Sequence, residues 1–138
     1  MTSRQAIFVA MTALAIGCGR SNGDPTAPSP PPTQNPPPNQ QPPVSTTTIT
    51  ITAAGVNPQR ITVSPGARVT FVNNDNRSHE MNSDPHPNHG DCPAIDDVGF
   101  IQAGQTKLTG NLTVVRTCGF HDHNQPTVAS LTGQIIVQ

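Results

Sequence analysis

Apolar and polar residues alternate along much of the chain after Ser45. In segment 48–53, Ile49, Ile51 and Ala53 fall on one face of an extended chain and threonines fall on the other. This period of two is typical of a β-strand that is buried on one side. No stretch repeats apolar residues with the period of a helix over several turns. The pattern therefore predicts an all-β fold.

Turn-forming residues separate further segments of the same kind. Between Arg77 and Asp97 the alternation stops, and we expect a polar loop there, because loops of this length usually have a function. The complete pattern predicts an antiparallel β-sandwich of about seven strands. Beyond the first strand, the expected strands are 61–63, 69–71, 99–101, 112–117 and 134–138.

The first residues predict export. Arg4 precedes an apolar run from Ala6 to Gly17, which is too short to span a bilayer but suits a signal peptide. The run ends at Cys18 and resembles the processing site of bacterial lipoproteins, in which this cysteine is lipidated. The resemblance implies a signal peptide over residues 1–18 with lipidation at Cys18. A soluble secreted domain is the alternative.

Residues 19–45 form a segment of different composition. They are nearly all Pro, Asn, Gln, Ser and Thr, and such a stretch cannot bury a core. It predicts a disordered, semi-rigid linker that reaches roughly 80 Å at about 3.1 Å per residue. The folded domain is then 46–138. The formal net charge is −1 and no basic run occurs, so nucleic acid is not an expected partner.

The residues that bind transition metals are concentrated in one part of this domain. All five histidines and two of the three cysteines lie between Phe71 and His123. Imidazole and thiolate are ligands of copper and zinc, whereas calcium and magnesium prefer oxygen. The concentration predicts a transition-metal site.

Three segments of the domain resemble the plastocyanin and azurin group of cupredoxins. Segment 57–75 contains the family's Pro-Gly turn and Val-x-Phe-x-Asn strand, and His79 follows as the family's first copper-binding histidine does. Cys118 and His121 match the family's Cys-x-x-His, and 131–137 resembles its closing strand. The resemblance implies a cupredoxin-like Greek-key β-sandwich with copper bound by His79, Cys118 and His121.

The resemblance also implies a function. Two imidazoles and one thiolate hold copper in a geometry that both oxidation states tolerate, so little reorganisation opposes electron transfer. We therefore expect a copper-binding electron-transfer protein rather than an enzyme, with a redox partner protein in the cell envelope. With a lipid anchor on Cys18, it would be an exported lipoprotein attached to a membrane and facing the periplasm or the cell exterior.

The family's axial methionine is missing, because Leu131 occupies the aligned position. Met81, His123 and Gln125 are the other candidates for this ligand. Met81 also suits a place in the core or at its rim, and Gln125 suits a solvated loop. The axial position therefore stays open.

Cys92 offers a competing role for Cys118. Two thiols of a small exported domain pair by default, and a Cys92–Cys118 disulfide would remove the thiolate from the copper site. Closing a loop of about 26 residues would stabilise the domain by roughly 3 kcal/mol. Both roles of Cys118 stay open, and His79 and His121 are candidate ligands under either.

Other histidines allow a copper site made of imidazoles alone. His86 and His89 lie in the polar loop and could bind a common ion with His79, His121 or His123. His121 and His123 share a face if their segment is extended, although His123 could instead support a ligand. Such a site predicts a copper-binding or delivery module in which the disulfide is formed. The alternatives are loop histidines that are solvated or hydrogen-bonded to aspartates, and a metal-free structural sandwich.

Overall fold

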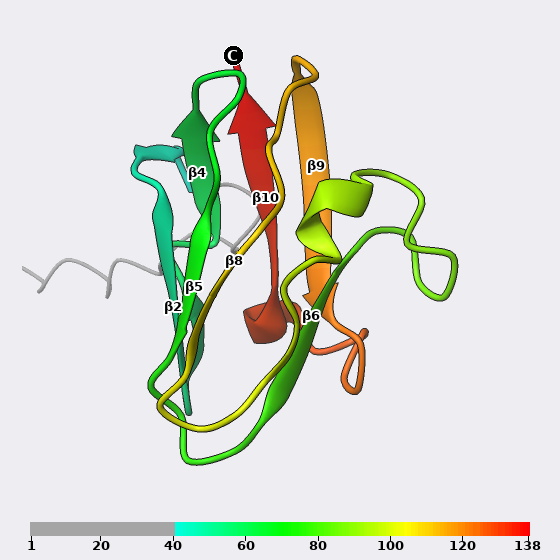
Figure 1. Cartoon of the computed structure of the whole chain (residues 1–138). Coiled ribbons are helices and arrows are strands. Elements are labelled where there is room, and N and C mark those ends of the chain that lie inside the picture. The colour runs from blue at the N-terminus through cyan, green and yellow to red at the C-terminus, as the bar shows by residue number, and fades with distance from the viewer. Residues whose placement is uncertain (1–40) are drawn as a thin grey trace, which may run out of the picture. The chain divides into compact units, whose positions relative to one another are not determined.

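The computed structural model describes residues 41–138, which form two β-sheets packed face to face (Figure 1). The expectations for the signal peptide, Cys18 and most of the linker lie outside these residues. The six-stranded sheet has the order β1 (Val44–Ser45), β4 (Arg60–Val63), β10 (Thr132–Val137), β9 (Arg116–Asp122), β6 (His79–Ser83) and β7 (Gly99–Ile101). The four-stranded sheet has the order β3 (Gly55–Asn57), β2 (Thr48–Thr52), β5 (Thr70–Asn73) and β8 (Thr106–Leu108).

The predicted sandwich is confirmed, but the prediction that all its strands are antiparallel is wrong. Strand β4 lies parallel to both β1 and β10, and β2 lies parallel to β5. The remaining strand pairs are antiparallel. Between β1 and β4 the chain forms β2 and β3 of the other sheet, and between β2 and β5 it passes through β4 of the six-stranded sheet. Two short 3-10 helices, η2 (Pro93–Ile95) and η3 (Ala129–Leu131), complete the described elements.

The core lies between the two sheets and contains the alternating residues. Ile49, Ile51 and Phe71 are fully buried, whereas Ala53 lies in an exposed turn beyond β2. The rings of Phe71 and Phe120 meet edge to face with centroids 5.3 Å apart, which joins β5 of one sheet to β9 of the other. Alternation therefore identified the buried face of the first strands correctly.

The predicted polar loop 77–97 contains a strand, β6. Its buried residues are His79, Met81 and Ser83, so two polar side chains occupy positions that an apolar pattern would have marked. The strand predicted at 112–117 begins only at Arg116 and continues to Asp122. Leu112 forms an isolated bridge with Ala67. No helix among the residues from 41 onward is long and apolar enough to cross a membrane.

Candidate metal centre

Strand β9 presents different chemistry on its two faces. Cys118, Phe120 and Asp122 alternate with Gly119 and His121, and Cys118 and Phe120 belong to the core between the sheets. Because successive side chains of a strand point to opposite faces, His121 lies on the outer face of the six-stranded sheet. It is nevertheless only 2% exposed, because the loop after β6 covers it. In Figure 1 this loop extends beside β9.

Four histidine side chains meet on this outer face. One ring nitrogen from each of the four lies within 4.8 Å of those of the other three. The ring centroids of the contacting pairs are 4.9 to 5.8 Å apart. This histidine cluster consists of His86, His89, His121 and His123.

The strand supplies two members of the cluster, His121 and His123. The backbone N–H of His123 donates to the carbonyl of Glu80 at 2.7 Å, which continues the pairing with β6 past the end of β9. The chain therefore stays extended from His121 to His123, and the two side chains share a face. Both histidines therefore reach the same cluster.

The loop after β6 supplies the other two members, His86 and His89. Backbone hydrogen bonds from Asp91 to Asp84 and from His89 to Pro85, both 2.8 Å, close the loop on itself. The N–H of Asp84 also donates to the carbonyl of Gly119 at 3.0 Å, which attaches the start of the loop to β9. The loop histidines are thereby held against the strand histidines.

Asp84 orients the buried histidine of the cluster. Its Oδ1 lies 2.6 Å from Nδ1 of His121, and because a carboxylate only accepts, Nδ1 carries the proton. In the neutral ring the other nitrogen, Nε2, is then an unprotonated acceptor, and it is buried without a hydrogen-bond partner. A Cβ atom on Gly119 would collide with the Asp84 carboxylate, so glycine leaves room for it. This is the arrangement of a histidine prepared to bind a metal.

The exposed member of the cluster, His86, is biased toward its neutral form. Desolvation, followed by the charges of His123, His121 and His89, lowers the pKa of His86 below its ordinary value of 6.5. Metal ions bind only the unprotonated imidazole, so the neighbours favour the state that binds.

The backbone of His89 is strained. Its φ is +48°, and it is the one described residue other than glycine with a positive φ. Left-handed backbone is unfavourable for most side chains but is tolerated by asparagine. Strain of this kind persists where surrounding structure or function requires it. His89 Nε2 lies 3.2 Å from Nδ1 of His123, inside the cluster.

Replacing His89 by asparagine should therefore separate stability from metal binding. We expect His89→Asn to raise the free energy of unfolding of the metal-free chain by roughly 1 kcal/mol, because asparagine accepts the left-handed backbone. The same variant should lose metal affinity, because an imidazole is gone. Denaturant unfolding and metal titration measure the two effects. His86→Asn is the control and should lose affinity without gaining stability; a stability gain in both variants would contradict the role of strain.

His79 was predicted as a copper ligand, but the structure places it away from the cluster. It lies on the inner face of β6 and is fully buried. Its Nδ1 is 2.8 Å from Asp122 Oδ2, and its Nε2 is 3.0 Å from Asp75 Oδ2. Both ring nitrogens are therefore occupied by carboxylates and not available to a metal. The cause is the register, which pairs Asp122 with Met81 and turns its side chain inward beside His79.

The carboxylate of Asp75 is held in its charged form. Burial by itself would raise its pKa, but hydrogen bonds from His79, from the backbone of Asn76 and from Arg77, together with the charge of Arg77, lower it below the ordinary 3.8. Asp75 and Asp122 are the partners of His79 that sequence reasoning missed. The available signal was the position of Asp122 between two histidines, since its side chain must point to the opposite face.

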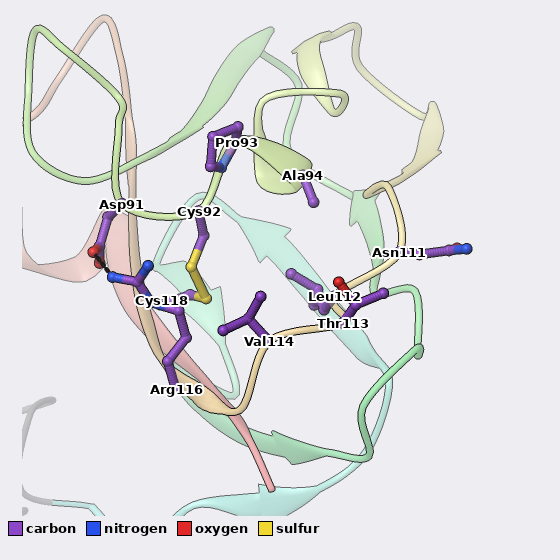
Figure 2. Close-up of a pocket in the computed structure, with 10 residues that line it drawn as sticks. All are labelled: Asp91, Cys92, Pro93, Ala94, Asn111, Leu112, Thr113, Val114, Arg116 and Cys118. Atoms are coloured by element: carbon purple, nitrogen blue, oxygen red, sulfur yellow. Dashed lines mark hydrogen bonds and ion pairs between the residues drawn. A yellow bond between two sulfur atoms is a disulfide. The ribbon is translucent and has the colours of Figure 1, made fainter.

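Cys118 is not a free thiolate, because it is bonded to Cys92 (Figure 2). The structure therefore contains the disulfide alternative, and the predicted copper ligation by Cys118 needs correction. In the cupredoxin motif that the sequence resembles, Cys-x-x-His places both copper ligands on one loop. Here β9 runs without interruption through both residues, and three positions along a strand point the side chains to opposite faces.

The residues considered for the axial position lie in different parts of the structure. Met81 is fully buried in the core, and Leu131 is 3% exposed in η3. The backbone N–H of Gln125 donates to the carbonyl of Asp122 in the turn after β9. His123 alone among these candidates belongs to the cluster.

The described residues thus form a β-sandwich with a histidine cluster that could hold a metal ion. Similar solved structures are cupredoxins. One is the purple cupredoxin of Nitrosopumilus maritimus, with 15% sequence identity, coverage of 67% of this chain and 100% of that chain, and a TM-score of 0.50. Another is oxidised plastocyanin of the fern Dryopteris crassirhizoma, with 16% identity, coverage of 66% of this chain and 99% of that chain, and a TM-score of 0.52. A third is an oxidised mutant of amicyanin, with 17% identity, coverage of 66% of this chain and 80% of that chain, and a TM-score of 0.51.

The chain therefore has the cupredoxin fold, as the resemblance of its motifs implied. No protein-family model matches the sequence, and no curated protein matches it either.

Proposed function

We propose that this domain binds one copper ion through the histidine cluster and serves as a copper-binding or delivery module. The observation that carries the proposal is the convergence of four imidazoles around the buried, unpaired Nε2 of His121. A buried acceptor without a partner costs about 1–3 kcal/mol, and a bound cation would remove this cost. Asp84 already holds the ring in the orientation that binding requires.

The donor set favours copper among the common ions. Imidazole suits copper, zinc and nickel, and divalent copper binds such ligands most tightly in the first transition row. One neighbour by fold, a mutant of amicyanin, is described as holding Cu(I). The family's thiolate does not fit this chain, because Cys118 is in a disulfide. When bound, the copper would either cycle between two oxidation states or be passed on as cargo.

Copper titration of the purified full chain tests the proposal. One equivalent of Cu(II) should bind, raise the melting temperature by mass action and show nitrogen hyperfine coupling in its EPR spectrum. The colour should be weak, because no thiolate is present for intense charge transfer. The double variant His86→Ala/His121→Ala should lose these signals. A melting temperature that saturating copper leaves unchanged would instead favour a metal-free structural sandwich.

Electron transfer is a second candidate function, favoured by the fold. It requires that the bound copper be reduced and reoxidised reversibly and that a redox partner protein accept its electrons. Voltammetry of the loaded chain separates it from delivery, since an ion that leaves on reduction is cargo. For either function we propose a place outside the cytoplasm, with a lipid anchor on Cys18. The disulfide supports this place, because such bonds persist in oxidising compartments.

A further inference from the structure

Two buried side-chain atoms lack a hydrogen-bond partner in the part of the chain from residue 41 onward. They are Nε2 of His121 and Oδ1 of Asn82. Buried polar groups of folded proteins are nearly always paired, so each exception calls for an explanation such as an ion. The two exceptions here share a location.

Asn82 and His121 lie directly opposite each other on neighbouring strands. They are register partners in the antiparallel pair of β6 and β9. Residues opposite each other in such a pair point to the same face, with their Cβ atoms about 4.5–5.5 Å apart. On β6 the inward residues are His79, Met81 and Ser83, so Asn82 points outward. Its side chain therefore lies on the face that carries the histidine cluster.

The two unpaired atoms are both acceptors. In the neutral ring of His121, Nδ1 carries the proton that Asp84 accepts and Nε2 carries none, and Oδ1 of Asn82 is a carbonyl oxygen. Two acceptors cannot satisfy each other. A cation placed between them would satisfy both at once, since imidazole nitrogen and amide oxygen are both metal ligands.

We propose that Oδ1 of Asn82 is an oxygen ligand of the ion held by the histidine cluster. This inference rests on the proposed function and adds a residue that sets which oxidation state of copper is preferred. Soft sulfur ligands favour Cu(I), whereas carbonyl oxygen suits harder ions. A centre of four imidazoles and one amide oxygen therefore prefers Cu(II) to Cu(I). Asn82 is the residue that adds to this preference beyond what the histidines provide.

Substitution of Asn82 by leucine tests the assignment, because leucine has a similar shape and no polar atom. Asn82→Leu should weaken Cu(II) binding on the order of tenfold. Cu(I) binding should change much less, and the Cu(II) EPR parameters should shift. Asn82→Asp keeps an oxygen in the same place and should retain Cu(II) affinity. Competition with chelators of known affinity measures both oxidation states.

The free energy of unfolding of the metal-free chain distinguishes a metal-binding asparagine from one that stabilises the fold. Replacing an unpaired buried acceptor by an apolar group of the same shape is neutral or stabilising. Asn82→Leu should therefore keep or raise the free energy of unfolding. Asn82→Ala, which cannot clash with its neighbours, serves if the leucine variant fails to fold. Asn88→Leu is the matched control, because Asn88 is an exposed asparagine of the loop that follows β6, and it should change neither affinity.

Two results would overturn the assignment while leaving the proposed function intact. One is an Asn82→Leu variant that binds Cu(II) with unchanged affinity and spectrum. The other is an equal loss of Cu(I) and Cu(II) affinity, which would show that Asn82 acts through the position of the histidines. Failure of the unaltered chain to bind Cu(II) would instead remove the proposed function.

Discussion

Loss of the disulfide is expected to lower the free energy of unfolding of the metal-free chain by about 3 kcal/mol. The bond closes a loop across a sequence separation of 26 residues, and the constraint removes entropy from the unfolded chain. The double variant Cys92→Ala/Cys118→Ala should show this loss in denaturant unfolding. Both cysteines belong to the core, so alanine leaves no buried hydroxyl in their place.

The same bond should also support the histidine cluster. Cys92 follows His89 by three positions in the sequence, and Cys118 precedes His121 in β9 by three positions. The disulfide thus ties the segment with two histidines to the segment with the other two. Figure 2 shows it among the side chains that line a pocket of about 200 Å³, next to the ion pair of Arg116 and Asp91.

The ion pair cannot replace the disulfide as a tie between loop and strand. The Arg116 side chain is 43% exposed, and exposed ion pairs contribute about 0–1 kcal/mol. The double cysteine variant should therefore bind Cu(II) more weakly, on the order of tenfold. Arg116→Ala is the matched control and should change the free energy of unfolding and the Cu(II) affinity only a little. Reductant should destabilise the unaltered metal-free chain and leave the double variant unchanged; an equal effect on both would refute the role of the bond.

The fold could be predicted largely from the sequence because its first strands follow simple alternation. Ile49 and Ile51, like Phe71, are apolar residues that face the core, and the pattern identified them. Strand β6 could not be found in this way, because His79 and Ser83 occupy its inward positions. Their burial depends on partners such as Asp122, which come from a strand far along the chain. Local periodicity contains no information about such partners.

The site was predicted in part for a similar reason. The residue types pointed to a metal, and the extended run from His121 to His123 placed two histidines on one face. The motif alone could not show that β9 continues through Cys118 and turns its sulfur toward Cys92. The choice between a thiolate and a disulfide depends on which face each residue occupies. That was settled by strand pairing rather than by sequence spacing.

Replacement of His79 is expected to destabilise the domain severely and to leave its metal centre intact. The ring lies between the carboxylates of Asp75 and Asp122, each of which has a side chain only 1% exposed. The ring thus bridges two buried carboxylates through its two nitrogens. His79→Gln removes this bridge and leaves at least one buried carboxylate without its hydrogen-bond partner. Leaving a buried polar group unsatisfied costs about 1–3 kcal/mol, and more when the group is charged.

The pH dependence of stability gives a second measure of the same contacts. The lowered pKa of Asp75 means that its contribution is present above the unfolded value of about 3.9 and is lost as the pH falls through the lower native value. The hydrogen bond from His79 causes part of this lowering. In His79→Gln the native pKa of Asp75 should rise toward the unfolded value. The stability of this variant should then depend less on pH across that acid range.

Copper binding separates this structural role of His79 from the ligand role that the family resemblance implied. Under conditions where His79→Gln remains folded, it should bind one Cu(II) with an unchanged EPR spectrum, because its ring lies on the opposite face of the sheet from the histidine cluster. His121→Gln is the matched comparison and should alter the spectrum, since it removes the buried imidazole of the cluster. If His79→Gln instead changes the copper spectrum while His121→Gln does not, the copper lies between the sheets, and the outer-face site is wrong.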